Sequence, residues 1–159
     1  MKKNIDYKKI WKTNDFSNMS WHDNKIHAVA FLDDAFELMF DIDYIMKWIE
    51  PKGKKSSYSF EVVPATLIFK NVWDLEFNLE SSLSTDIQEI QRQNPKKPKN
   101  IDHIKEDLEY DWLIETINGE ISFKSTGFQQ YSKKKVFIQT EQSISLDERG
   151  GPARPAAIS

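Results

Sequence analysis

Two of the three histidines in the chain bracket an aspartate in the segment Trp21-His22-Asp23-Asn24-Lys25-Ile26-His27. Two imidazoles and a carboxylate are ligands typical of zinc or non-haem iron sites, and the same groups can transfer protons. Asp41 or Asp43 could complete such a site if the strand that carries them pairs with the strand of His27. The segment therefore raises a metal hypothesis and an acid–base hypothesis.

The register of two predicted strands decides whether these groups meet. Residues 26–31 and 36–44 are rich in apolar side chains, and Asp33-Asp34 between them favours a tight turn, so the two runs should form a hairpin. A two-residue turn places His27 on the apolar face, whereas a shift by one residue places it opposite Asp41. We favour the first register, because it keeps one face of the hairpin apolar throughout.

Three interpretations of the histidine segment follow. In the first, His27 is a partly buried residue hydrogen-bonded to the backbone or to a neighbour, and His22 and Asp23 form the turn that begins the strand. In the second, Trp21, His22 and Asp23 line a pocket for a ligand or a partner. In the third, the segment holds a metal. The first is the ordinary role of such residues, and we predict no metal, no cofactor and no catalytic residue, with Trp21, His22 and Asp23 as the candidate binding residues.

Two acidic rows could also act as the paired carboxylates of a glycosidase or a nuclease. These rows are Glu37/Asp41/Asp43 and Asp74/Glu76/Glu80. The solvent-facing side of an antiparallel strand carries the same alternating pattern. We therefore expect both rows to face solvent.

Motifs that identify common enzymes are missing from the sequence. It contains no G-x-S-x-G elbow, no P-loop and no G-x-G-x-x-G run, and five glycines leave little material for a phosphate-binding loop. The absence of cysteine excludes disulfides, thiolate catalysis, cysteine-bound zinc and iron–sulfur clusters. Nothing in the sequence supports an enzyme.

The charge of the chain also limits its partners. The formal net charge is -3, and Lys and Arg are interleaved with Asp and Glu, so no basic surface for a nucleic acid is predicted. The first residues have the positive charges of a secretion signal, but no apolar stretch follows them and no later stretch is long enough to span a membrane. We expect a cytoplasmic protein with no membrane or nucleic-acid partner.

Alternating side chains predict a mainly β fold with antiparallel strands. Residues 72–80 alternate between apolar and polar types as cleanly as residues 36–44. Residues 112–117 and 120–124 flank Asn118-Gly119, which favours a type I′ hairpin turn and would place Thr116 opposite Ile121. We expect a curved sheet, a sandwich or a partly open barrel.

Two short helices complete the predicted fold. One covers residues 6–14 at the N-terminus, and the other lies near residues 85–93, where Thr85 and Gln88 form a capping-box pattern. A last strand is predicted over residues 135–140. Residues 1–149 then form a single β-rich domain, and the small, proline-containing residues 150–159 form a flexible or foreign tail.

The run Ser20-Trp21-His22-Asp23, the hairpin that follows it, and residues 64–75 resemble a small uncharacterised bacterial family. Some of its members resemble predicted immunity proteins of contact-dependent toxin systems. The resemblance covers residues 18–80. It implies a cytoplasmic, β-rich bacterial protein that neutralises a toxin by binding it, without catalysis.

Together these observations predict a non-catalytic protein-interaction module, similar to an immunity protein, that binds a partner in the bacterial cytoplasm. The alternative is a domain that binds a small ligand or a metal, or an enzyme, centred on Trp21, His22, Asp23 and His27. The oligomeric state stays open.

Overall fold

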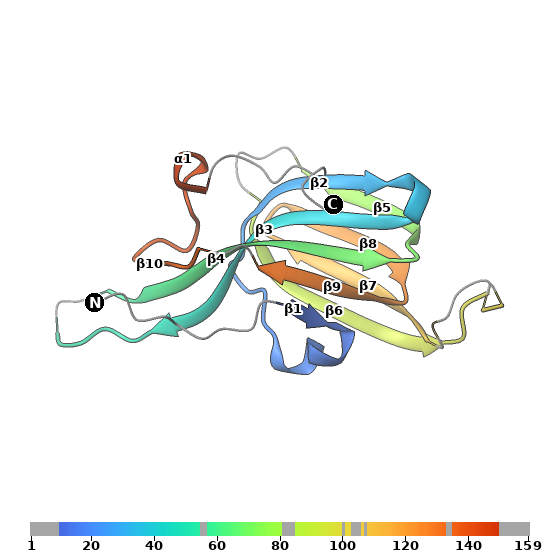
Figure 1. Cartoon of the computed structure of the whole chain (residues 1–159), viewed down its shortest axis with the longest axis horizontal. Helices are drawn as coiled ribbons and strands as arrows, with labels where there is room; N and C mark the ends of the chain where they lie inside the picture. The colour runs from blue at the N-terminus through green and yellow to red at the C-terminus, as the bar shows by residue number, and fades with distance from the viewer. Residues whose placement is uncertain are drawn as a thin grey trace.

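Two antiparallel β-sheets pack face to face around the main core and do not close into a barrel (Figure 1). The computed structural model describes residues 10–54, 57–80, 85–99, 101–102, 106, 108–132 and 135–149. The first sheet has the order β1 (Ile10–Lys12), β9 (Gly127–Ser132), β4 (Ser59–Lys70), β3 (Glu37–Ile49) and β2 (Ile26–Leu32), with β10 (Phe137–Gln139) beside β4. The second has the order β5 (Trp73–Leu79), β8 (Gly119–Ser125), β7 (Glu109–Thr116) and β6 (Ile87–Lys96). Three short helices are η1 (Thr13–Asn18), η2 (Asp33–Ala35) and α1 (Leu146–Arg149). The prediction of a mainly β, antiparallel fold is confirmed.

The two sheets are continuous at one corner, where β4 leads into β5 and β8 leads into β9. The carbonyl of Lys70 accepts hydrogen bonds from the Ser125 hydroxyl at 2.6 Å and the Thr126 amide at 3.2 Å. Gly127 follows with φ of 151°, and a Cβ there would lie 2.0 Å from the Thr13 hydroxyl oxygen. Glycine is therefore required where the paired strands turn from one sheet into the other.

A second connection joins the segment before β2 to the start of β6. The Asp23 amide donates to the Ile87 carbonyl at 2.8 Å, and the Ile87 amide donates to the Asn24 carbonyl at 2.8 Å. These bonds fix residues 23–26 between the sheets, so the histidine segment is anchored to both.

Aromatic side chains fill the space between the sheets. Phe69 of β4 lies 5.0 Å from Trp112 and 4.7 Å from Phe123 between ring centroids, both at steep interplanar angles. Such edge-to-face pairs add about 0.5–1.5 kcal/mol each beyond the burial of apolar area. This core holds the two sheets together without a disulfide.

Tyr44 lies at one side of this core, and its ring centroid is 5.1 Å from that of Trp11. Burial raises the pKa of the phenol from 10.0 to about 12, and a hydrogen bond with the Ser20 backbone lowers it only in part. The pKa of Tyr44 is therefore higher in the folded protein than in the unfolded chain. The free energy of unfolding keeps its full contribution from the neutral phenol below pH 10, and this contribution is lost as the pH rises toward 12.

We therefore predict that Tyr44→Phe changes the alkaline stability of the protein. The shift corresponds to about 2–3 kcal/mol of unfolding free energy, which the native chain should lose as Tyr44 ionises and the variant should not. Urea unfolding at a series of pH values from neutral to alkaline measures this. Parallel pH profiles for the two proteins would contradict the burial of the Tyr44 hydroxyl.

The helix predicted near residues 85–93 is wrong, because strand β6 occupies Ile87–Lys96. Ile87 and Ile90 are both buried, and their spacing of three resembles that of a helix. The pairing with β7 shifts between Ile87 and Glu89, and this irregularity directs both isoleucines toward the core. The β-bulge thus produces a spacing of buried residues that is also typical of a helix.

The predicted N-terminal helix over residues 6–14 is wrong at residues 10–12, and of its described residues only 13–14 lie in a helix. Residues 10–12 form β1 beside β9, and η1 is a 3-10 helix over Thr13–Asn18. Residues 6–9 lie outside the described residues, as does the predicted tail over 150–159. The C-terminal strand predicted over residues 135–140 exists but is shorter, since β10 covers only Phe137–Gln139.

Both predicted hairpins exist, but each register differs from the prediction by two residues. Ile121 pairs with Ile114 rather than Thr116, and Phe40 pairs with Val29. In the hairpin of β7 and β8, Gly119 has a positive φ of 132°, but it already pairs with Thr116 as part of β8. Asn118 lies in the turn and has no positive φ, so the turn is not type I′. A shift of two residues leaves each side chain on the same face, which is why the predicted apolar faces are correct.

Candidate functional site

The three predicted site residues line two cavities: Trp21 and His22 share one, and Asp23 lines the other. Trp21 is buried, and its indole nitrogen donates to the Gln130 side-chain oxygen at 2.8 Å. Its ring packs edge-on against Phe128, with centroids 5.6 Å apart. Trp21 is therefore part of the core, and it also lines a cavity of about 250 Å³ together with His22.

His22 lies at the surface beside another exposed aromatic residue. Its imidazole stacks on Trp48 with centroids 6.4 Å apart, and its Nδ1 lies 3.0 Å from the Gln88 carbonyl oxygen. These contacts place the ring over the start of β6. His22 is accessible, but its contacts with Gln88 and Trp48 hold it in place.

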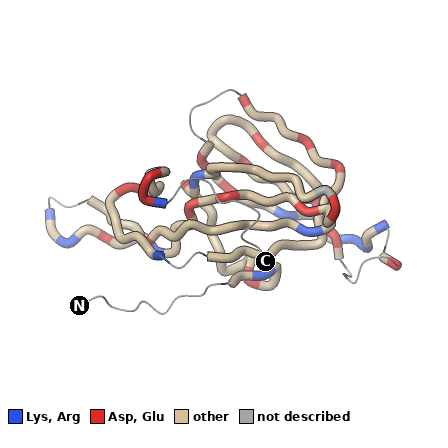
Figure 2. Tube along the Cα trace, turned by 45° about the horizontal axis from the view of Figure 1, so that its top comes forward, with Lys and Arg blue, Asp and Glu red and all other residues tan. Residues whose placement is uncertain are grey.

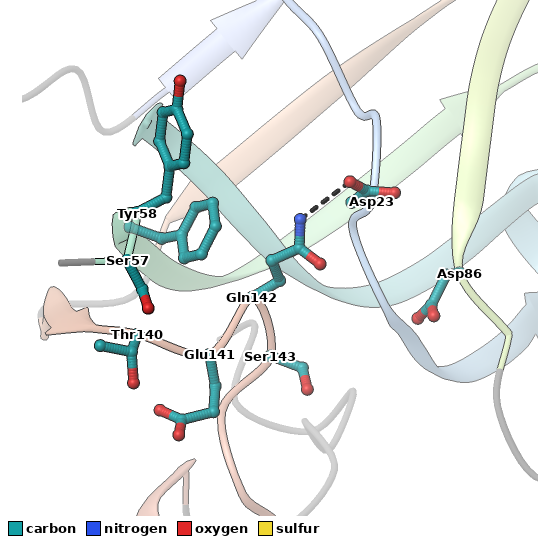
Figure 3. A pocket seen from close by; sticks show the side chains of 9 residues that line it. Asp23, Ser57, Tyr58, Asp86, Thr140, Glu141, Gln142 and Ser143 are labelled. Atoms are coloured by element: carbon teal, nitrogen blue, oxygen red, sulfur yellow. Dashed lines mark hydrogen bonds between the residues drawn. The ribbon is translucent and has the colours of Figure 1, made fainter. Parts of the chain in front are cut away.

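Asp23 has φ of 63° and lines an open cavity of about 510 Å³ (Figure 3). One of its carboxylate oxygens accepts a hydrogen bond from the Gln142 side chain at 2.8 Å. Asp86 and Glu141 also line the cavity, and its lining includes no Lys, Arg or His among the residues that the structure describes. Tyr58 and several hydroxyl-bearing residues form the rest of its wall. The charge of the cavity suits a cation.

His27 lies in a buried charged cluster on the outer face of the first sheet. Its Nε2 is 2.6 Å from the carboxylate of Asp43, and both side chains are almost completely buried. The β2–β3 register shifts between Ile26 and Ala28, and this bulge turns His27 away from the main core. The prediction that His27 faces the core side is wrong, whereas its hydrogen bond to a neighbour is confirmed.

Arg149 supplies the cation of this cluster. Its side chain is 0% exposed and donates from Nη1 and Nη2 to the two oxygens of Asp41 at 2.8 and 3.0 Å. Its Nε donates to Asp43 at 3.1 Å. Burial would lower the pKa of Arg149, but its hydrogen bonds and charge contacts with Asp41 and Asp43 together raise it above its ordinary value. The guanidinium stays charged and forms ion pairs with both carboxylates.

The segment that carries Arg149, here called the C-terminal strap (residues 140–149), covers the outer face of β3. The Ile144 amide donates to Asp43 at 2.8 Å, and the Ile144 side chain packs with Ile45, Phe60 and Val62. The expectation that Asp41 and Asp43 face solvent is therefore wrong. By contrast, Asp74, Glu76 and Glu80 are exposed, as expected.

This geometry disfavours the metal hypothesis. Among the described residues, no group of three or more histidines and carboxylates could hold a metal ion. His27 does meet Asp43, as that hypothesis required, but Arg149 occupies the position that a metal would take beside the two aspartates. His22 lies apart from this cluster, because its ring contacts Gln88 and Trp48.

A further candidate site lies where the terminal strands β2 and β5 of the two sheets meet (Figure 1). Phe31 and Phe77 contact each other there with centroids 5.9 Å apart, yet they are 57% and 42% exposed. Both belong to the inward faces of their strands, because they pair with the buried Leu38 and Ile121. The core is thus open to solvent along this side.

We call this surface the apolar mouth, and it comprises Phe31, Phe36, Phe77 and Leu79. Phe36 and Leu79 are 70% and 38% exposed. Acidic residues follow its borders along β5, at the start of β8 and at the β2–β3 turn (Figure 2). They are Asp34, Glu37, Glu76, Glu80 and Glu120. An exposed apolar group with a charged border is typical of an interaction surface.

Comparison with known proteins found no match: no family model, no curated protein and no solved structure is similar to the chain. In the part of the chain that the structure describes, no helix is long and apolar enough to cross a membrane. The candidate function therefore rests on the residues and their arrangement.

Proposed function

We propose that the protein is a non-catalytic interaction module that binds a protein partner through the apolar mouth. The exposure of Phe31 and Phe77 supports this proposal most directly. The two rings contact each other and remain exposed to solvent, so a partner could bury them without rearranging the fold. Rigid aromatic residues of this kind often contribute most of the energy of an interface.

The resemblance to immunity proteins gives this proposal a biological form. The protein would bind and neutralise a toxin in the bacterial cytoplasm, and no step of that role needs a catalytic residue. In the described site, Asp43 contacts both His27 and Arg149, and Asp41 contacts Arg149, so these groups form structural contacts.

The double substitution Phe31→Ser/Phe77→Ser tests the proposal. We expect partner affinity to fall by about 2 kcal/mol or more, roughly thirtyfold, because both rings lose their contact area. The partner is first captured from the bacterium that encodes the chain, or taken from a toxin gene beside it, and its affinity is then measured by calorimetry with purified proteins.

Ile138→Ser is the matched control, since Ile138 is 60% exposed but lies on β10, in another part of the molecule. It should bind like the native protein. Equal affinity of all three proteins would exclude the apolar mouth as the interface. Cells that carry the neighbouring toxin gene should survive with the control and die with the double variant.

The cavity at Asp23 supports a second candidate function, the binding of a small organic cation. Three carboxylates and the Tyr58 ring line it, and such a lining can attract an amine through charge and cation–π contact. For this function, we expect Asp23→Asn/Asp86→Asn to weaken the binding of spermidine about tenfold in calorimetry. Glu148→Gln, on the surface of α1, is the control. No measurable heat with the native protein would exclude this function.

A further inference from the structure

Strand β2 differs from the other terminal strands of the two sheets. Sheet edges usually carry a charge, a proline or a bulge that prevents another strand from pairing with them. β1 contains Lys12, β5 contains Asp74 and Glu76, and β6 contains Glu89 and Pro95. β10 has no charge or proline, but it is only 3 residues long, and a very short edge strand offers little for pairing. The sequence of β2 is Ile-His-Ala-Val-Ala-Phe-Leu, without a formally charged residue or a proline.

The irregular part of β2 is confined to its beginning. The bulge lies at His27, whose side chain is held by Asp43, and residues 28–32 then pair regularly with residues 41–37 of β3. Within the described residues, β3 is the only strand that pairs with β2. The other edge of residues 28–32 therefore offers its backbone groups for pairing.

The side chains around this edge leave room for another strand. Ala28 and Ala30 pair with Asp41 and Met39 on the outer face, and both are small. Val29 and Phe31 lie on the inner face, which continues into the apolar mouth. A strand added here would extend this inner face and cover Phe31 and Phe77.

We propose that the partner binds by adding an extended, basic strand to the free edge of β2, in which apolar residues alternate with Lys or Arg. This inference rests on the proposed function and specifies its mode. The apolar side chains would face Phe31 and Phe77, and the basic ones would lie toward the acidic border of the mouth. Backbone hydrogen bonds would provide affinity and the alternating side chains specificity.

Charge distinguishes this occupant from a second copy of the chain. Two copies paired through β2 would bring together two sets of the acidic residues that border the mouth, on a chain whose formal net charge is -3. Like charges at an interface oppose association, whereas opposite charges increase the rate and specificity of binding. A basic partner strand is therefore favoured over self-association.

A blocked peptide in which lysine and valine alternate over the length of β2 serves as the probe. We expect it to shift the amide signals of residues 28–32 in the NMR spectrum of the full chain and to slow their hydrogen exchange. The same peptide with N-methyl groups on every second residue should bind about tenfold more weakly, because it cannot complete the backbone pairing. A peptide alternating glutamate and valine should also bind weakly.

Two protein variants locate the contact. Ala30→Lys places a positive charge on the proposed edge and should weaken the lysine–valine peptide about tenfold. Asn78→Lys adds the same charge to the exposed face of β5 and should have a smaller effect. Equal effects of the two substitutions would show general electrostatic attraction and overturn the strand addition.

The outcomes separate this inference from the proposed function. If Phe31→Ser/Phe77→Ser abolishes partner binding while the peptides leave residues 28–32 unchanged, the interface stands and strand addition is wrong. If the substitutions leave partner binding unchanged, the proposed function itself fails. Sedimentation showing a dimer whose β2 amides are protected would overturn the proposal in favour of a second copy.

Discussion

Replacing Arg149 by methionine should destabilise the protein by about 3–5 kcal/mol, the usual cost of leaving one member of a buried ion pair without its partner. The guanidinium is completely buried and contacts both Asp41 and Asp43. Methionine retains much of the apolar volume but leaves two adjacent carboxylates without their cation. For a chain of this length, the melting temperature should fall by about 6–20 °C.

Two further variants show whether charge or shape is responsible. Arg149→Lys keeps the charge but loses the planar pair of hydrogen bonds to Asp41, so it should be intermediate. Combining Arg149→Met with Asp41→Asn and Asp43→Asn removes the unpaired charges and should restore part of the loss. Leu146→Ala on the exposed side of α1 is the control and should change stability little. A native-like melting temperature for Arg149→Met would show that the strap does not depend on this cluster.

Local patterns predict β3 and β5 well because each of these strands has one face on the main core. Residues 36–44 and 72–80 lie in or overlap β3 and β5. Successive side chains of a strand point to opposite faces of the sheet, so apolar side chains occupy every second position where one face packs on the core. The same reasoning failed for Asp41 and Asp43. A second layer, the C-terminal strap, covers the outer face of β3, and no local pattern in residues 36–44 indicates a segment about a hundred positions later.

The favoured interpretation of the histidine segment, a His27 hydrogen-bonded to a neighbour, is confirmed, but the predicted face of His27 is wrong. The motif predicts that His27 could meet Asp41 or Asp43, and it does meet Asp43. The sequence could not reveal the bulge that turns His27 outward or the arginine that completes the cluster. Arg149 directly precedes a segment of tail-like composition, so its position concealed its role.

The sequence pattern does not predict the apolar mouth, although it predicts the strands that carry Phe31 and Phe77. Phe31 and Phe77 occupy correct core-facing positions in their predicted strands, and alternation assigns them to the interior. Their exposure arises from topology, because β2 and β5 are the last strands of their sheets. Sheet order depends on long-range pairing that alternation does not encode.

Trp112→Ala should lower the free energy of unfolding by about 3–5 kcal/mol, as much as Arg149→Met, because it removes a large side chain that is 1% exposed. The indole lies between the sheets, with Phe69 5.0 Å and Phe16 5.5 Å from it between centroids. Its nitrogen donates to the Ser125 carbonyl at 3.0 Å, directly beside the corner where β8 becomes β9. The residue therefore contributes both packing and the geometry of the corner.

Trp112→Phe separates these two contributions. It retains an aromatic ring but loses the hydrogen bond to Ser125, so it should cost less than alanine by about 1–2 kcal/mol or more. Denaturant unfolding measures both variants, and hydrogen exchange of the Thr126 and Gly127 amides reports on the corner. We expect faster exchange there in both variants, because the indole no longer fixes the Ser125 carbonyl. If Trp112→Phe exchanged at the native rate, the hydrogen bond would have no part in holding the corner and the loss on alanine substitution would be due to packing alone.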